Sequence, residues 1–353
     1  MKKAFILLFL IISFYTRVSA QNDATTLINE GVALHDAGNF SAAVKKYDEA
    51  LTLEPGNFLA MYEKSFSLME MENYKEAEPL LKKILKGCKD DGLRMNTYVN
   101  YGNLLDYQKK QKKSIEMYRE GLKEYPNSYQ LYFNMGITES GRGEREFALE
   151  NFLNAIKRNP LHASSHNAVA RLLMNSNRVA AIMSFFTFLM IEPEGIRAQQ
   201  NLGSLQQLFM KGISRGENGN TVIGINSDML SPTQKNRSKF DEDFRSADLM
   251  LSLLGASVDG VADSLKLKTS ADKMSYQMQM LVNVLDESKN NGPISSIYLP
   301  FLKELKEKSW MQAACYFIMK DAQQKEINDW LVKNQDNVVK MLEWFEGYRW
   351  SVN

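Results

Sequence analysis

The sequence is poor in the residues that most catalytic and metal sites require. Its 353 residues include three histidines and two cysteines. It contains no Cys-x-x-Cys pair, glycine-rich phosphate loop, calcium loop or serine nucleophile elbow. Eight prolines and 20 glycines exclude a collagen-like or low-complexity chain. We therefore expect a globular protein that binds no cofactor or metal and is not an enzyme.

An excess of charge of one sign is also missing. The chain has 43 lysines and arginines against 42 aspartates and glutamates. Lys2, Lys3 and Arg17 lie in the first twenty residues, which contain no acid, so the remainder has a slight acidic excess. This balance gives no electrostatic basis for binding nucleic acid or an anionic membrane surface.

The N-terminal stretch MKKAFILLFLIISFYTRVSA has the composition of a secretory signal peptide over residues 1–20. Its apolar run from Ala4 to Tyr15 is shorter than the roughly 20 residues that a membrane span needs. The expected cut after Ala20 is followed by Gln21 and not by the cysteine of a lipoprotein. We expect an exported protein, periplasmic or secreted, that does not insert in a membrane.

Similar segments recur through the first half of the chain, each ending in a proline. They include NFSAAVKKYDEALTLEP, QKKSIEMYREGLKEYP and REFALENFLNAIKRNP, and the prolines are Pro55, Pro126, Pro160 and Pro193. Successive prolines are 71, 34 and 33 residues apart, and residues 58–89 supply the unit missing from the longest interval. A period of about 34 residues made of two helical patterns indicates a helical repeat.

Small residues keep the same register in each unit and meet an aromatic residue of the second helix. They are Gly31, Ala43 and Ala50 with Tyr47, then Gly102, Ser114 and Gly121 with Tyr118, then Gly136, Ala148 and Ala155 with Phe152. This pattern resembles the tetratricopeptide repeat family over residues 24–195. The resemblance implies about five repeats in an all-α, right-handed superhelical solenoid with a concave side.

The rest of the chain has no recognisable repeat. We predict a capping helix at 196–213, a linker rich in Gly, Asn and Ser at 214–240, and a separate α-helical C-terminal domain at 241–353. A short extended piece is expected at 221–225. The apolar run AAIMSFFTFLMI in the fifth repeat predicts a helix buried on two sides.

The resemblance also implies a ligand site in the concave groove, which the first helix of each repeat lines. Carried over by register, the predicted peptide-binding residues are Asn29, Tyr62, Phe66, Asn100, Asn103, Phe133, Asn134, Asn167 and Arg171. His35, Met69, Asp106 and Ile137 share that face. Asparagine amides can both donate to and accept from a peptide backbone. The alternative is a groove that packs against the chain's own C-terminal half.

Some family members clamp an acidic chain terminus with lysines and arginines in this groove. The corresponding places here hold Thr25, Ile28, Leu59, Tyr62, Asn96, Val99, Gln130 and Phe133, so no such clamp forms. The partner is therefore expected to be a protein or peptide held by other contacts.

Few other residues suggest chemistry. His162 and His166 have metal-ligand spacing but lack a third ligand nearby, which favours structural histidines. Ser270 and Lys273 match a penicillin-binding motif whose partner motifs are absent, so a helix start is the better interpretation. The Met-rich stretch at 277–284 fits core packing or an adaptable binding surface. Pairing of Cys88 with Cys315 stays open, although two buried thiols are the simpler interpretation.

The sequence thus favours an exported protein–protein interaction scaffold that assembles envelope or secretion complexes through the groove. The alternative is a cell-wall hydrolase or transferase with its active site in the C-terminal helices. The sequence specifies neither the partner nor the oligomeric state.

Overall fold

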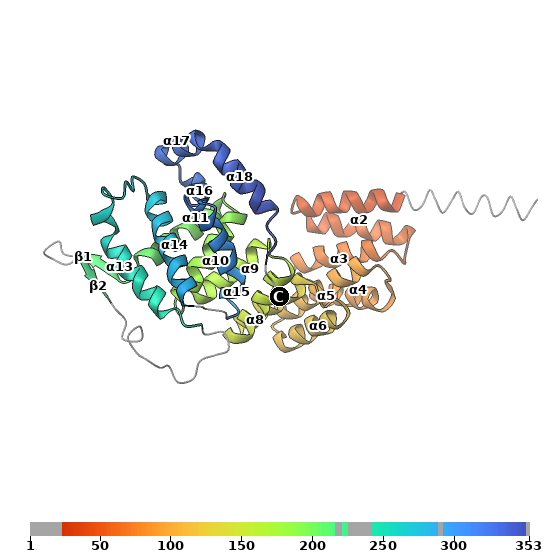
Figure 1. The fold of residues 1–353 in the computed structure, drawn as a ribbon. Coiled ribbons are helices and arrows are strands. Elements are labelled where there is room, and N and C mark those ends of the chain that lie inside the picture. Colours follow the sequence, from red (N-terminus) through yellow and green to blue (C-terminus); the bar gives the residue numbers. More distant parts are fainter. Residues whose placement is uncertain (1–22, 216–220, 225–241, 289–291, 351–353) are drawn as a thin grey trace, which may run out of the picture. The chain divides into compact units, whose positions relative to one another are not determined.

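The computed structural model describes residues 23–215, 221–224, 242–288 and 292–350. The expected signal peptide at 1–20 and most of the predicted linker lie outside these ranges. Among the described helices, none is both long and apolar enough to cross a membrane. The chain divides into two compact units, residues 1–142 and 143–353 (Figure 1).

The first unit is a stack of helices that pack on their neighbours in sequence. A helix at residues 23–36 is followed by α2 (Phe40–Leu53), α3 (Phe58–Glu70), α4 (Tyr74–Gly87), α5 (Asp91–Tyr107), α6 (Gln111–Glu124) and α7 (Tyr129–Gly141). The first helices of successive repeats also touch, α3 with α5 and α5 with α7. The predicted all-α repeat architecture is confirmed.

Local chemistry fixes where these helices begin and end. Asn57, Asp90 and Ser128 cap α3, α5 and α7, each accepting a hydrogen bond from the backbone N–H three residues on. The second helices of four repeats end two residues before a proline, because the residue ahead of a proline avoids helical geometry. The residues directly before these prolines have ψ angles between 68° and 89°, outside the helical region; they are Glu54, Tyr125, Asn159 and Glu192.

The glycines of the first helix allow a tyrosine of the second helix to pack directly against the backbone. A Cβ atom at Gly31 would lie 2.5 Å from the Tyr47 ring, and one at Gly102 would lie 2.1 Å from the Tyr118 ring. Both tyrosines are fully buried. The recurrent small residues and aromatics of the sequence are therefore the two sides of one packing contact.

The second unit continues with helices and one hairpin. Its elements are α8 (Arg145–Arg158), α9 (Ala163–Leu173), α10 (Arg178–Ile191), α11 (Ile196–Met210), β1 (Ile213–Arg215), β2 (Thr221–Ile223), α13 (Arg245–Val261), α14 (Ser270–Glu287), α15 (Ser295–Glu307), α16 (Met311–Ile318), η1 (Lys320–Ala322), α17 (Lys325–Lys333) and α18 (Gln335–Glu346). The strands pair antiparallel with Ile213 opposite Ile223. The expected extended piece is thus one strand of a hairpin.

Helix α10 forms the centre of this unit (Figure 1). Every residue from Arg178 to Met190 is buried, because the helix contacts α9 and α11 and also α13, α15 and α16. Burial on two sides, predicted from the apolar run, is confirmed. The compact division falls at 142/143 and not in the segment 214–240, since α10 packs the last repeats and the C-terminal helices into one core.

Candidate binding surface

The first helices of the first unit expose large apolar side chains at repeat positions that the sequence predicts to face a ligand. The exposed fractions are 47% for Leu59, 36% for Phe66, 53% for Tyr107 and 45% for Ile137. We call the following residues the first-helix face: Asn29, Asp36, Leu59, Tyr62, Glu63, Phe66, Asn100, Asn103, Asp106, Tyr107, Phe133, Asn134 and Ile137. Because α3 contacts α5 and α5 contacts α7, this face continues from repeat to repeat.

Tyr62 and Asn100 come together from neighbouring first helices. Burial raises the pKa of the Tyr62 phenol to about 12; the Glu63 carboxylate adds to the rise and the Asn100 amide partly offsets it. Asn100 is only 8% exposed, and its Nδ2 atom is buried without a partner in hydrogen-bond geometry. A buried donor in this state costs about 1–3 kcal/mol, which a suitable acceptor would recover.

The other two asparagines predicted on α5 and α7 are held by the protein itself. Asn103 Oδ1 accepts a hydrogen bond of 2.6 Å from the Tyr118 hydroxyl, and Asn134 Nδ2 donates to the Gln130 carbonyl at 2.8 Å. These two amides and the buried Asn100 therefore do not simply face water. Asn103 is reached by Tyr118 of the neighbouring helix α6, whereas Asn134 bonds to the carbonyl one turn earlier in its own helix α7.

Phe66 is positioned by a histidine of the preceding repeat. The rings of His35 and Phe66 stack with centroids 4.7 Å apart, and His35 Nδ1 lies 2.8 Å from the Ser67 hydroxyl. His35 also meets Phe40 edge-on. One face of Phe66 is thus fixed, which leaves the rest of its exposed surface available for contact at little entropic cost.

Two acids stand near this aromatic group without a basic partner. Burial raises the pKa of the Glu63 carboxyl, and repulsion from the Asp36 carboxylate adds to the rise. Burial raises the pKa of Tyr47, and the Glu63 and Asp36 carboxylates both add to the rise. The sequence-based prediction omitted Glu63, although its register, two residues before the small Ser65, is that of Asn29, Asn100 and Asn134.

The sequence of these helices matches models of a known protein family. Tetratricopeptide repeat models match residues 34–92 and residues 96–128. The N-terminal half of the chain carries tetratricopeptide repeats. Arrays of such repeats present extended surfaces on which partners bind. A comparison with curated proteins finds no match.

Several solved tetratricopeptide repeat structures are similar to this chain. PilF of Pseudomonas aeruginosa is 17% identical, with a TM-score of 0.44, and the match covers 55% of this chain and 91% of that protein. PilW, a type IV pilus biogenesis factor, is 16% identical at a TM-score of 0.42, covering 53% and 91%. YrrB, described as having an unusual peptide-binding site, is 22% identical at a TM-score of 0.37, covering 53% and 93%.

Seven of the nine predicted peptide-binding residues lie in the first unit of the tetratricopeptide array, and two lie in the second. In the first unit Asn29 is exposed and Tyr62, Asn103, Phe133 and Asn134 are half-buried. In the second, Arg171 of α9 donates a 2.8 Å hydrogen bond to Asn201 Oδ1 of α11, and Asn167 Oδ1 is buried without a partner.

The sequence-based prediction also missed Asn201. It is 1% exposed, and its Nδ2 atom has no hydrogen-bond partner. The missed signal is an Asn-x-Gly pattern, which ends at Gly31, Gly102 and Gly136 in the repeats and recurs at Gly203. The helix predicted as a solvated cap therefore has the register of a further first helix.

The histidines of the second unit serve structure. His166 is fully buried; its Nε2 donates to the Pro160 carbonyl at 2.8 Å, and its Nδ1 lies 3.0 Å from the Tyr298 hydroxyl of α15. Burial lowers the pKa of His166 to about 4. His162 Nδ1 pairs with the Ser165 hydroxyl at 2.8 Å. The predicted structural role of these histidines is confirmed.

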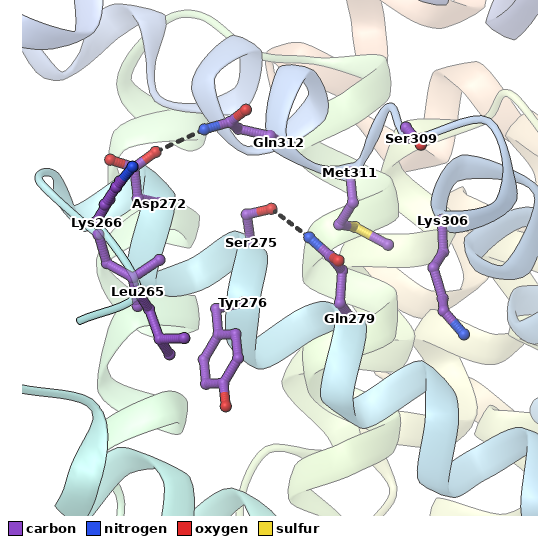
Figure 2. A pocket seen from close by; sticks show the side chains of 11 residues that line it. Leu265, Lys266, Asp272, Ser275, Tyr276, Gln279, Lys306, Ser309, Met311 and Gln312 are labelled. Carbon is purple, nitrogen blue, oxygen red and sulfur yellow. Dashed lines mark hydrogen bonds between the residues drawn. The ribbon is translucent and has the colours of Figure 1, made fainter. Parts of the chain in front are cut away.

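A polar hollow of about 290 Å³ lies beside α14 and α16 (Figure 2). Its acid, Asp272, accepts hydrogen bonds from the backbone N–H of Lys268 and Thr269 and from the side chains of Gln312 and Tyr316. Thr269 is the N-cap of α14, and the Asp272 carboxylate completes a capping box with it. Ser270 therefore begins a helix, as the sequence predicts. The oxygen atoms of Asp272 already accept hydrogen bonds from the protein itself.

Both cysteines are buried free thiols. Burial raises the pKa of the Cys315 thiol, and the nearby Asp272 adds to the rise. A thiol in this state is a poor nucleophile, because the thiolate is the reactive form. The simpler of the two interpretations of the cysteines, two small buried side chains, matches the structure.

Proposed function

We propose that this protein is an interaction scaffold that binds an extended polypeptide segment on the first-helix face. The observation that supports the proposal is the exposure of Leu59, Phe66, Tyr107 and Ile137 at predicted ligand positions of consecutive first helices. Exposed apolar side chains that line up on one face mark interaction sites, whereas single ones scattered over a surface do not.

Polar groups between these apolar side chains suit a polypeptide better than a purely apolar ligand. Asn29 is exposed, Asn134 is half-buried, and Asn100 has an amide donor without an acceptor. An extended backbone offers a carbonyl or an N–H every residue, so amides spaced by the repeat can contact it whatever its sequence. Apolar side chains of the same segment would cover Phe66 and Ile137.

We also propose that the scaffold acts after export, in the assembly of envelope or secretion complexes. The basis is the signal-like stretch at residues 1–20. Sequencing the N-terminus of the protein purified from the exporting cell tests this. A chain that starts at Gln21 supports export, and a chain that retains residues 1–20 contradicts it.

The binding proposal is tested by selecting ligands from a phage library of random linear peptides on the chain without residues 1–20. Affinities of the selected peptides are then measured for Phe66→Ser, Ile137→Ser and the matched control Leu53→Ser. Leu53 is 44% exposed but lies on the second helix α2. We expect the first two variants to lose about tenfold or more and the control to bind normally.

Two results would overturn the proposal. One is the absence of any peptide enriched above background. The other is an equal loss in Leu53→Ser and Phe66→Ser, which would place the contact outside the first-helix face.

A further inference from the structure

The charges of the first unit are divided between its two sets of helices. The first helices, residues 23–36 with α3, α5 and α7, carry eight acidic residues against two basic ones. The second helices α2, α4 and α6 carry seven acidic residues against ten basic ones. The nearly neutral chain therefore carries its acidic excess on the first helices. Glu30 pairs with Lys46 of α2 and Glu139 is buried, so the acidic surface of the first-helix face consists of Asp36, Glu63 and Asp106.

The two basic residues of the first helices do not neutralise this surface. Lys64 Nζ pairs with Asp48 Oδ1 at 2.5 Å, and the Arg94 guanidinium pairs with Glu124 at 2.6 Å. Both partners belong to second helices, α2 and α6. Glu63 and Asp36 have no salt bridge within the described part of the chain.

Glu63 is the acid placed best to meet a ligand. It is half-buried next to Tyr62 and Tyr47, where burial and Asp36 both disfavour its charge. A carboxylate held there without a cation is costly to the fold, and a cation brought by a partner would offset that cost.

A second observation, on the next first helix α5, points to a ligand on the same face. The Asn100 Nδ2 atom, on the helix next to Tyr62, is buried and lacks an acceptor. A peptide carbonyl is the acceptor that it requires, and a neighbouring lysine or arginine is the cation that Glu63 and Asp36 require. One basic polypeptide segment supplies both groups.

We propose that the partner segment carries a lysine or arginine that lies between Glu63 and Asp36, with apolar residues on either side that cover Phe66 and Leu59. This inference rests on the proposed function and names the chemistry of its partner. The acidic charge also guides such a segment to the face, so association is expected to slow as salt increases.

The test begins with the composition of the peptides selected on the unmodified chain. We expect them to be enriched in lysine and arginine among apolar residues. A double-mutant cycle then compares one such peptide and its Lys→Gln counterpart on the unmodified chain and on Glu63→Gln. Either change alone, Lys→Gln in the peptide or Glu63→Gln in the protein, should weaken the affinity about three- to tenfold. Making both changes should weaken it little more than making one.

The matched control is Glu116→Gln, which removes the same charge from the exposed surface of the second helix α6. It should leave the affinity unchanged. Asp36→Asn should act like Glu63→Gln, with a smaller effect because Asp36 is exposed.

The possible results separate the two proposals. Peptides that bind the first-helix face without basic residues, or additive losses in the cycle, would overturn the basic partner and leave the interaction scaffold intact. If no peptide is selected, or if Phe66→Ser and Ile137→Ser bind the selected peptides normally, both the scaffold and the basic partner are overturned.

Discussion

At the scale of single residues, the repeat depends on where a side chain is absent. Gly102 and Gly203 hold the same place in their first helices, yet their surroundings differ. A Cβ atom at Gly102 would meet the Tyr118 ring at 2.1 Å, whereas one at Gly203 would meet nothing within 4 Å. The same substitution should therefore act in opposite directions at the two sites.

We predict that Gly102→Ala destabilises the protein by about 1–3 kcal/mol, because the Tyr118 ring is buried and has no room to move aside. Gly203→Ala should stabilise it by about 0.5–1 kcal/mol, because alanine favours a helix interior over glycine. Urea unfolding of both variants checks the pair. Equal effects would show that helix propensity and not ring packing governs these positions.

Glu63 leads to a prediction in which stability and binding separate. Its folded-state pKa is raised, so between the ordinary carboxyl pKa of about 4.3 and the raised value the folded protein binds more protons than the unfolded chain. Its contribution to stability therefore decreases as pH rises through that window. Glu63→Gln should raise stability at pH 7 by up to about 1 kcal/mol and should have little effect below the window.

Thermal unfolding at several pH values measures this, with Glu116→Gln as the control. Glu116 is exposed, so its substitution should change stability by less than about 0.5 kcal/mol. If Glu63→Gln were less stable than the unmodified chain at pH 7, the carboxylate would have a stabilising partner and the account of its environment would be wrong.

At the scale of helices, the sequence predicts most of the first unit and less of the second. The prolines, the small residues and the aromatics each act within one hairpin, so their spacing reveals the repeat directly. The packing of α10 depends on helices that begin more than fifty residues after α10 ends. Its apolar run shows that it is covered on all sides, but no sequence pattern identifies α13, α15 and α16 as the cover.

The same limit applies to the binding surface. The register places Tyr62, Phe66 and Asn100 on the predicted ligand positions, and the structure adds what each one touches. Contacts such as Tyr118 to Asn103 or Asn100 to Tyr62 join separate helices, so spacing alone does not reveal them. Glu63 and Asn201 lie in the same register and were recoverable from it.

Arg178 fastens the start of α10 to the C-terminal helices. Its buried guanidinium contacts the Asp248 carboxylate and backbone carbonyl, the Ser252 hydroxyl at 2.8 Å and the Lys211 carbonyl at 2.9 Å. We predict that Arg178→Ala costs about 3–5 kcal/mol, because it leaves a partly buried Asp248 without its cation. The exposed Arg145, on α8, supplies the control, since Arg145→Ala should cost much less. A smaller effect at Arg178 would mean that water replaces the lost contacts.

At the scale of the whole molecule, the pH dependence of stability should be dominated by one buried histidine. The pKa of His166 is about 4 when folded and about 6.5 when unfolded, so the unfolded chain binds more protons between these values. The contribution of neutral His166 to the free energy of unfolding of the second unit is therefore fully present above pH 6.5. That free energy should decrease by about 3 kcal/mol as the pH falls to 4. Glutamine cannot titrate, so the acid loss should be smaller in His166→Gln, as measured by urea unfolding at each pH.

The compact division at 142/143 makes a further claim about the molecule. Because α10 joins the last repeats to the C-terminal helices, cutting the chain between Gly224 and Glu242 should not release two independent halves. A specific protease site inserted there, followed by gel filtration of the cleaved protein, checks this. Co-elution of the fragments is expected, and their separation would support the separate C-terminal domain that the sequence predicts.

The central claim is that the first-helix face binds a polypeptide, and hydrogen exchange of the full chain with and without a selected peptide tests it most directly. We expect added protection in the helix at 23–36 and in α3, α5 and α7, with little change in α4 and α6. Protection that appears instead on the second helices, or only in the C-terminal helices 242–350, would contradict it.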